Sequence, residues 1–470
     1  PRSLRGAGTR TCVRSVEQNG MPSRAWAEEL GSCVTDVIAS RPEDPLKQLA
    51  HLLSRPNARP DWNETASAYA KRHSLEQHLQ VAIDAVGLTV LEAATPDAID
   101  QLCRELRALA QQQVAKARGH RVVTYNLLSP ELGEPARFPR NDAADLDPLT
   151  RLARIRARLA EHMAVGAVLC LQEVSAAWAV KLAPFFEEKR YTVVSAMYHS
   201  MVFTGYMGNL LCWPAELYEC LDADSLRVKD TKKWPPAPPP VVDPSEPPSR
   251  PPFDPWVEAG KKENAIVMAR LRPRAAAAGA EFCVGSWHGP VAFGPPAKVQ
   301  MAVLVNVAAA HAMLEFAKGT PCVLAGDFNQ VPSVSVKGAP QPNPPYTLLT
   351  TGTLPADSPG YPPERAGGWS VELPSPFVSA YKAAKGAEPE LTTKATQDAD
   401  GAMGKPSRPF PFVDTIDYIF TNDGDGRAAA WTLKAVGSLP SKAEAATVCE
   451  SYPTADEPSD HLLLWADLSL

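Results

Sequence analysis

The sequence predicts an α/β fold over residues 119–470, preceded by a small all-helical region. From residue 119 the chain consists of short apolar runs of the length of buried strands, separated by polar loops. Two longer segments with helical character lie between some of these runs, as an α/β core requires. The length of 470 residues and the hydrophobic content of 45% provide enough apolar side chains for one large domain and a smaller one.

Nine apolar runs are predicted as strands and two long segments as helices. The strands are RVVTYNLL, AVLCLQEV, YTVVSA, NLLCW, NAIVMARL, EFCVGSW, CVLAGDF, TIDYIF and HLLLWADL. The helices are DPLTRLARIRARLAEHMAV at 147–165 and AKVQMAVLVNVAAAHAMLEFAKG at 297–319. Residues 234–256 are too rich in proline for a helix or a central strand. We expect a solvated insertion there, and a ligand for a proline-recognising module is the alternative.

Residues 21–117 carry helical patterns and almost no strand signal, after a basic stretch at 1–20 that we expect to be a disordered tail. A transit-like targeting segment is the alternative for the tail. Two amphipathic stripes within 21–56 are separated by RPEDP, where proline ends one helix and begins the next. This stretch resembles the RIIα-type dimerisation–docking motif, which implies a homodimer and an amphipathic-helix partner. A helical hairpin packed on the main domain is the alternative, and residues 73–113 contain a candidate second copy.

The composition excludes several classes of function. The net charge of −6 is not that of a strongly basic nucleic-acid binder, although a local basic groove fits within it. Nine cysteines contain no CxxC pair, which argues against a zinc site or a disulfide framework and fits a reducing compartment. No apolar stretch is judged long enough to cross a bilayer, so no membrane association is expected. The expected location is intracellular and cytoplasmic, with ciliary, flagellar or organelle association as the alternative.

Chemically capable side chains gather at the ends of the predicted strands. They are Asn126, Glu173, His288, Asp327, Asn329, Asp417, Asp460 and His461. Four carboxylates brought together would repel one another unless a cation lay among them. Oxygen ligands of this kind suit Mg²⁺ or Mn²⁺, and two histidines beside them add proton donors or phosphate-binding cations. The pattern therefore predicts a metal-assisted phosphoester hydrolase.

The same positions, taken in order, resemble the endonuclease/exonuclease/phosphatase superfamily, which has the DNase-I-like fold. The resemblance rests on Asn126, LQEV at 171–174, His288, GDFN at 326–329, IDYIF at 416–420 and SDH at 459–461. It covers residues 119–470 and implies a four-layered sandwich of two mixed β-sheets flanked by helices. TYNLLSPEL and FVSAYKAAKGAEPELTTKATQ resemble the branch that contains poly(A)-shortening nucleases, nocturnin and 2′,5′-phosphodiesterases. SWHGP departs from the usual Thr-His-Leu of that branch, which leaves the role of the histidine in question.

The resemblance implies a role for each acidic or amide side chain. Glu173 would be the main metal ligand, with Asn126 and Asp460 completing the shell. Asp327 would orient or deprotonate the attacking water, and Asn329 would hold a phosphate oxygen.

It also implies roles for the two histidines and their neighbours. His461 would bind the phosphate and stabilise the transition state, with Asp417 fixing its tautomer. His288 would hold the phosphate or protonate the leaving oxygen. Tyr346 is expected to be structural.

Three functions follow as hypotheses. The first is a Mg²⁺-dependent 3′-exoribonuclease or deadenylase, in which Trp178, Trp213 and Lys298 are candidates for the lining of an RNA groove. The second is a phosphatase or phosphodiesterase for a small phosphorylated molecule such as a nucleotide, a dinucleotide or an inositol phosphate. The third is a scaffold anchored through the N-terminal motif in a ciliary, flagellar or chromatin assembly. Because every position that would touch metal or phosphate is filled, an enzyme is favoured over a scaffold.

Overall fold

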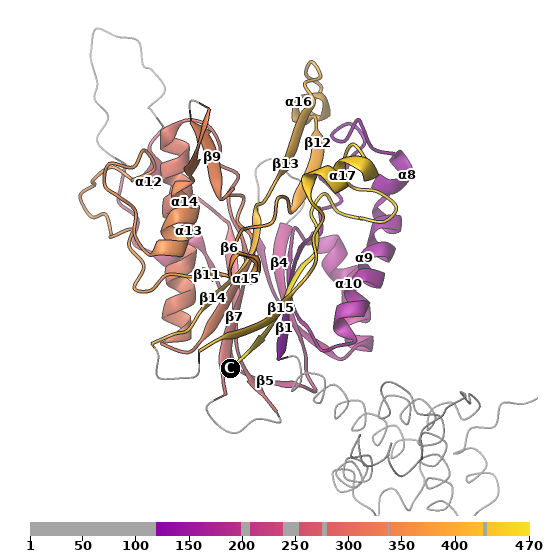
Figure 1. Ribbon diagram of the computed structural model, residues 1–470, viewed down its shortest axis with the longest axis horizontal. Coiled ribbons are helices and arrows are strands. Elements are labelled where there is room, and N and C mark those ends of the chain that lie inside the picture. The colour runs from indigo at the N-terminus through magenta and orange to yellow at the C-terminus, as the bar shows by residue number, and fades with distance from the viewer. Residues whose placement is uncertain (1–118, 199–206, 238–252, 275–279, 337, 426–429) are drawn as a thin grey trace, which may run out of the picture. The chain divides into compact units, whose positions relative to one another are not determined.

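The computed structural model describes residues 119–198, 207–237, 253–274, 280–336, 338–425 and 430–470 (Figure 1). The predictions for the tail at 1–20 and for the helical region at 21–117, with its docking motif, lie outside the described residues. They stay predictions.

Two six-stranded mixed sheets form the described part of the chain. In spatial order, the first sheet contains β15 (Thr432–Val436), β16 (Leu464–Ser469), β1 (His120–Asn126), β2 (Val168–Gln172), β4 (Met207–Pro214) and β3 (Tyr191–Tyr198). The second contains β11 (Val378–Ser379), β14 (Asp417–Asn422), β8 (Cys322–Asp327), β7 (Phe282–His288), β6 (Ala265–Pro273) and β5 (Tyr218–Arg227). Two hairpins complete the strands: β9 (Ser333–Val336) with β10 (Ala339–Pro342), and β12 (Thr393–Gln397) with β13 (Phe410–Asp414).

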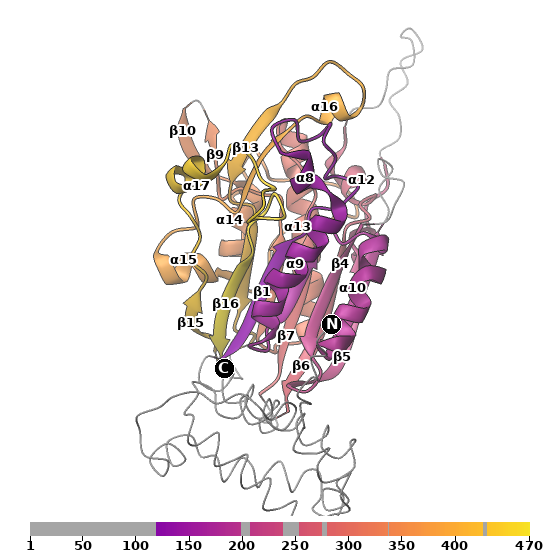
Figure 2. The same ribbon diagram turned by 90° about the vertical axis from the view of Figure 1, so that its right-hand side faces the viewer.

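Helices lie on the outer faces of both sheets (Figures 1 and 2). Those associated with the first sheet are α8 (Ala143–Leu146), α9 (Pro148–Met163) and α10 (Ala176–Glu188). Those associated with the second are α11 (Val228–Thr231), α12 (Pro255–Ala259), α13 (Pro296–Ala317) and α14 (Pro344–Thr351). Three short helices lie in connections: α15 (Ala380–Lys385), α16 (Ala399–Ala402) and α17 (Lys442–Val448).

Alternation along the strands produces three apolar layers. Val122 belongs to the cluster between the two sheets, whereas Val123 belongs to the cluster beneath α9 and α10, because successive side chains of a strand point to opposite faces. A third cluster fills the space between the second sheet and α13. The order is thus helix, sheet, sheet, helix, which confirms the predicted four-layered sandwich.

Helix α13 corrects one expectation from the sequence. It has the length and composition of a membrane-crossing helix, with a mean hydropathy of 1.5, so an apolar stretch of sufficient length is present. However, 67% of that window is buried inside the protein, and its side chains join the cluster on the second sheet. An all-round apolar surface is what a helix packed on several sides in a large core requires.

The proline-rich segment is anchored more firmly than predicted. Its last residue, Trp256, lies in α12 and is 3% exposed, and Trp234 at its start packs against the same core cluster. Arg365 joins the two flanks, since it donates to the carbonyl of Pro236 and forms an ion pair with Asp254. The solvated loop expected for 234–256 is therefore wrong at both ends, because two large indoles gain more from burial than from exposure. Residues 238–252 lie outside the described part.

Gly326 allows the close approach of β7 and β8 just before the last residue of β8. A Cβ at this position would lie 1.8 Å from the carbonyl oxygen of Trp287 on the neighbouring strand. We expect Gly326→Ala to lower the free energy of unfolding by about 3 kcal/mol, because the two strands would have to separate. Urea denaturation measures this. Gly386→Ala is the control, since a Cβ there meets open space and only the left-handed backbone is penalised, by about 1 kcal/mol. Equal losses in the two variants would contradict the argument.

Candidate active site

The sheet registers bring the predicted polar side chains to one edge of the sandwich. β1 and β2 run parallel and pair Asn126 with Gln172, so Glu173 follows directly at the same edge. β7 and β8 also run parallel and pair His288 with Asp327. β14 runs antiparallel to β8, and its first residue, Asp417, pairs with Asp327. Strand ends from both sheets therefore deliver these groups to one place.

The amide of Asn126 joins two carboxylates. Its Nδ2 donates to Glu173 Oε1 at 3.1 Å and to Asp327 Oδ2 at 3.0 Å. Its Oδ1 accepts from the Leu128 N–H at 2.9 Å, and the Ser129 N–H donates to Glu173 Oε2 at 3.0 Å. Asn126 thus presents its nitrogen to the carboxylates rather than the oxygen that a metal ligand needs. Its placement supports a positioning role, and the predicted role as a ligand stays a prediction.

His461 lies among three carboxylates. Its Nδ1 is 2.9 Å from Asp417 Oδ2, and its Nε2 is 3.8 Å from Asp327 Oδ2 and 3.9 Å from Asp460 Oδ1. Thr392 Oγ1 donates to Asp417 Oδ2 at 2.6 Å and accepts from the Asp417 N–H. The contact with Asp417 fixes the ring so that Nε2 faces the other two carboxylates, as the predicted roles require.

His288 is held from both ends. Tyr198 Oη forms a hydrogen bond with His288 Nδ1, and Asn264 Nδ2 donates to the His288 carbonyl at 2.9 Å. His288 Nε2 then lies 3.5 Å from Asp327 Oδ2 and 3.8 Å from Glu173 Oε1. The predicted site histidine is therefore beside the carboxylates, despite the unusual residues that follow it.

Asn329 supports Asp327 in this structure. Its N–H donates to Asp327 Oδ1 at 2.8 Å, and its Nδ2 donates to the Gly289 carbonyl at 3.0 Å and to Asp327 Oδ2 at 3.3 Å. A contact between Asn329 and a phosphate oxygen requires release of the last of these bonds.

Backbone strain concentrates at this edge. Of the five non-glycine residues with positive φ in the described part, three are here: Leu128 at 53°, Glu173 at 55° and Asn329 at 54°. Each such conformation costs on the order of 1–3 kcal/mol and persists only where the surroundings enforce it. The turns after β1, β2 and β8 are thus held in the shapes that aim these side chains.

Burial and the crowding of charges shift the pKa values of the site residues. Burial, and then the neighbouring Asp417, raise the pKa of Asp327 to about 8. Burial also raises the pKa of Asp460 and lowers that of His288. Burial alone would lower the pKa of His461, but Asp417, Asp460 and Asp327 together raise it well above its ordinary value. This direction favours the protonated form of His461, which is suited to binding a phosphate oxygen.

The donor set fits a divalent metal. One ligand atom each from Glu173, His288 and Asp327 lie within 4.8 Å of one another, and the same holds for Asp327, Asp417 and His461. Asp460 Oδ1 is buried and has no hydrogen-bond partner among the described residues, although Gln397 donates to its Oδ2 at 3.0 Å. A cation supplies what this oxygen lacks and offsets the repulsion that raises the neighbouring pKa values.

A groove of about 1,080 Å³ opens over this cluster. Six of the eight predicted side chains line it: Glu173, His288, Asp327, Asn329, Asp460 and His461. Asn126 and Asp417 lie behind them, linked by the hydrogen bonds described above. All eight predicted residues are thus brought together.

Sequence reasoning missed several contributors. Thr392 and Gln397, which bind Asp417 and Asp460, occur in the TTKATQ stretch that supported the family resemblance, so a signal was present. No feature of the sequence indicated Tyr198, the hydrogen-bond partner of His288. Two candidates for the groove were wrong, because Trp178 and Trp213 are each 1% exposed and pack in the core as large apolar side chains do. Lys298 lies on α13 and does not line the groove.

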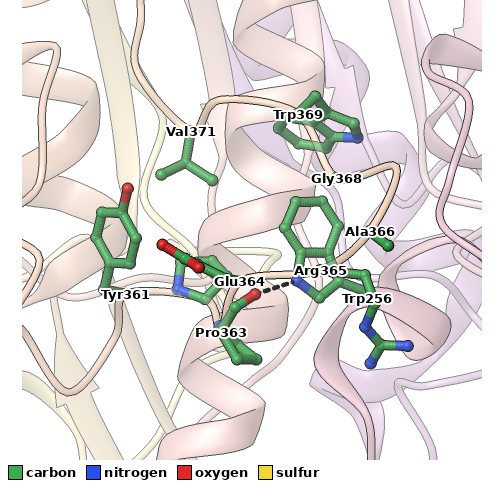
Figure 3. A pocket seen from close by; sticks show the side chains of 10 residues that line it. Trp256, Tyr361, Pro363, Glu364, Arg365, Ala366, Gly368, Trp369 and Val371 are labelled. Atoms are coloured by element: carbon green, nitrogen blue, oxygen red, sulfur yellow. Dashed lines mark hydrogen bonds between the residues drawn. The ribbon is translucent and has the colours of Figure 1, made fainter. Parts of the chain in front are cut away.

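A second pocket of about 520 Å³ lies between α12 and the 361–371 segment (Figure 3). Trp256 and Trp369 form part of its wall at a ring separation of 5.3 Å, and Trp256 Nε1 donates to the Pro363 carbonyl at 2.8 Å. It shares no lining residue with the groove over the carboxylates. Figure 3 shows Glu364 among its wall residues. The phosphoester chemistry therefore belongs to the first groove.

Comparison with known proteins identifies the class. Residues 123–461 match the model of the Endonuclease/Exonuclease/phosphatase family, and the chain belongs to this family. Members are metal-dependent phosphoesterases, so the chain is a hydrolase that acts on phosphoester bonds with a divalent metal.

Solved structures share the fold. ANGEL2, described as a 2′,3′-cyclic phosphatase, is 19% identical with a TM-score of 0.52, and the match covers 74% of this chain and 95% of that one. The human nocturnin catalytic domain is 17% identical with a TM-score of 0.44, covering 74% and 93%. The chain has no match among the curated proteins compared. At 19% identity the likeness to ANGEL2 shows the fold alone.

Proposed function

We propose that the chain shortens single-stranded RNA from its 3′ end by Mg²⁺-dependent hydrolysis, with Mn²⁺ able to replace Mg²⁺. The observation that carries the proposal is an aromatic wall directly beside the catalytic cluster. Phe293, after β7, and Phe412, on β13, line the groove and contact each other with ring centroids 5.7 Å apart, and Phe410 lines it as well with 66% of its surface exposed. Exposed aromatic rings that line a groove offer stacking surfaces for nucleobases.

The size and the charge of the groove suit the end of a polymer. Its volume lies at the top of the range for pockets that enclose a small molecule, which favours a larger ligand that enters from one side. Lys261 and Lys262 follow α12 on the rim, and Arg137 lines the groove as well. These cations can form ion pairs with the phosphates on either side of the bond to be cleaved.

The chemistry assigned to each side chain follows from its position. Asp327 would orient the attacking water and accept its proton. His461 and His288, with Nε2 atoms facing Asp327, would donate to oxygens of the phosphoryl group. Glu173 and Asp460 would hold the metal, which supplies positive charge to the phosphoryl oxygens when bound. The water must attack opposite the leaving oxygen, so these groups must converge on one point, as they do here.

A small phosphorylated molecule is the second candidate substrate. Among the described lining residues only three are lysine or arginine, and the chain as a whole carries a net charge of −6. The aromatic wall would hold a single nucleotide equally well. Because ANGEL2 is described as a 2′,3′-cyclic phosphatase, RNA ends with a 2′,3′-cyclic phosphate belong in the same test.

A substrate panel separates these activities. The full chain is incubated with Mg²⁺ and a 5′-labelled oligo(A) RNA with a 3′-hydroxyl, the same RNA with a 2′,3′-cyclic phosphate, or small nucleotides. We expect a ladder that shortens from the 3′ end of the first RNA and that disappears in EDTA. Phosphate release from nucleotides with intact RNA would move the function to the second candidate, and opening of the cyclic phosphate without shortening would indicate an end-processing enzyme.

The aromatic wall can be tested within the same panel. Phe412→Ala should raise KM for oligo(A) about tenfold or more while kcat falls less, because stacking binds the base and takes no part in bond cleavage. Phe253→Ala is the control, since Phe253 is an exposed phenylalanine that does not line the groove, whereas Phe412 is half-buried in its wall. Equal effects of the two substitutions on KM would remove the support that the aromatic wall gives to a nucleotide substrate.

A further inference from the structure

One arginine is completely enclosed next to the catalytic cluster. Arg151 lies in the first turn of α9 and is 0% exposed. Its guanidinium lies 5.1 Å from the centre of the Trp178 ring, and a Cβ on Gly133 would meet its Nη1 at 2.6 Å. A buried arginine is costly unless its donors are satisfied. Nη1 has no hydrogen-bond partner among the described residues, whereas Nε and Nη2 are paired, and their partners indicate what the side chain holds.

The partners are main-chain carbonyls from two segments that lie far apart in the sequence. Nη2 donates to the carbonyls of Leu127 and Leu128 at 2.5 and 2.6 Å, and Nε donates to the carbonyl of Pro458 at 2.7 Å. Leu127 follows Asn126 directly, and Pro458 lies two residues before Asp460. One side chain therefore fixes the turn after β1 to the turn before His461.

Both turns carry site geometry. The turn after β1 places the Asn126 amide against Glu173 and Asp327 and the Ser129 N–H against Glu173. The left-handed backbone of Leu128, which this turn needs, is held by the hydrogen bond to its carbonyl. The other turn places Asp460, and Ser459 Oγ adds a second link by donating to the Asn126 carbonyl at 2.7 Å.

The charge of Arg151 also faces the carboxylates. Burial lowers its pKa to about 10, while Asp460 and Glu173 act in the opposite direction, so the guanidinium stays a cation at neutral pH. It does not bind either carboxylate directly in the described structure. Its contribution is to hold the main chain on either side of them.

We propose that Arg151 is a positioning residue of the metal site, which sets the separation between the Glu173 side and the Asp460 side by binding the carbonyls of both turns. The inference rests on the proposed metal-assisted hydrolysis and does not depend on which phosphoester is the substrate. Groups that orient metal ligands without touching the metal change metal affinity by about 10- to 100-fold when they are removed.

The test measures Mn²⁺ affinity on the full-length chain by calorimetry, together with the dependence of activity on Mg²⁺. Arg151→Met keeps a long side chain and removes every hydrogen-bond donor from it. Arg151→Lys keeps the charge but loses the planar guanidinium with its several N–H donors. Arg154→Met and Arg158→Met are matched controls, because both lie on α9 and bind the same C-terminal segment, at Thr454 and at Asp456. Neither donates to a main-chain carbonyl of the turn after β1 or to that of Pro458, although Arg158 also forms an ion pair with Glu457, the residue before Pro458.

We expect Arg151→Met to raise the Kd for Mn²⁺ at least tenfold and Arg151→Lys to lie between it and the parent. The controls should lose thermal stability yet keep the parent affinity within twofold. Saturating Mg²⁺ should restore kcat of the Arg151 variants to within tenfold of the parent, which a collapsed site would not allow. Where Arg151→Met does not fold, Arg151→Lys carries the comparison.

Unchanged Mn²⁺ affinity in a folded Arg151 variant would overturn the inference, as would an equal loss in the two controls. If the parent binds Mn²⁺ and cleaves none of the phosphoesters in the panel, the proposed function fails while the affinities still decide the role of Arg151. A parent that binds no Mn²⁺ overturns both.

Discussion

Replacing Asp327 with asparagine is expected to reduce kcat by about 10³- to 10⁴-fold while the protein stays folded. The carboxylate is the only group at the end of β8 that can accept a proton from water, and removal of a general base commonly costs 10²- to 10⁴-fold. The upper part of that range applies because Asp327 also connects the other site residues. It pairs with Asp417 on the neighbouring strand β14, and its Oδ2 lies 3.5 Å from His288 Nε2 and 3.8 Å from His461 Nε2.

The stability of Asp327→Asn should be close to that of the parent. Burial and Asp417 raise the pKa of Asp327 to about 8, so its charged form is disfavoured in the metal-free fold. A neutral side chain of the same shape relieves that repulsion, and its oxygen can still accept from the Asn329 N–H. This relief offsets the loss of the bonds that Asn126 and Asn329 donate to Asp327 Oδ2. A large loss of rate without a loss of stability is therefore the signature of chemistry at this position.

Single-turnover cleavage and thermal unfolding measure the two quantities. Asp357→Asn is the control, since Asp357 is exposed in the loop that follows α14. A loss of less than tenfold in kcat for Asp327→Asn would remove Asp327 from the proton-accepting role, and a collapse of the fold would show that its role is structural.

The second large effect is expected from Glu173→Gln, which should raise the Mg²⁺ concentration for half-maximal activity by roughly 100-fold. A glutamine keeps the shape of the side chain, but it replaces one carboxylate oxygen with an amide nitrogen and removes the charge that attracts a hard cation. The glutamine oxygen can still accept from the Ser129 N–H, so this turn should persist, while the bond from Asn126 Nδ2 is lost. Dialysis against EDTA should abolish the activity of the parent, and Mg²⁺ or Mn²⁺ should restore it.

A titration of initial rate against Mg²⁺ measures this effect. Glu364→Gln is the matched control, because Glu364 lines the second pocket and should leave the Mg²⁺ dependence unchanged. A Glu173→Gln enzyme with the parent's Mg²⁺ dependence would show that the metal is held elsewhere.

The sequence predicted the α/β class and the polar groups at the strand ends because apolar runs are a strong local signal, whereas the four layers were implied by the family resemblance. The strand Cys322–Asp327 is apolar up to its last residue, and β1 is fully buried from Val122 to Asn126, so the polar group that ends each one stands out. Parallel pairing then brings Asn126 beside Glu173 and His288 beside Asp327, which the order of motifs implied.

Other features could not be predicted because they depend on contacts between distant segments. Trp178 and Trp213 are buried because of the way α10 and β4 pack in the core, and the residues next to them in the sequence give no signal of this burial. The partnership of Tyr198 with His288 joins two sheets, and Arg151 contacts a turn more than 300 residues away. The orientation of the Asn126 amide is likewise set by the hydrogen bond from the Leu128 N–H, in a local turn that the sequence does not predict.

The central claim is that Glu173 and Asp460 hold a divalent metal at the ends of the strands, beside Asp327 and His461. Anomalous scattering from a crystal grown with Mn²⁺ tests it most directly. The account predicts one strong peak about 2 to 2.5 Å from a carboxylate oxygen of Glu173 and beside Asp460 Oδ1, a buried oxygen without a hydrogen-bond partner among the described residues. A Mn²⁺ peak away from this cluster, or none at a concentration that supports activity, would contradict it.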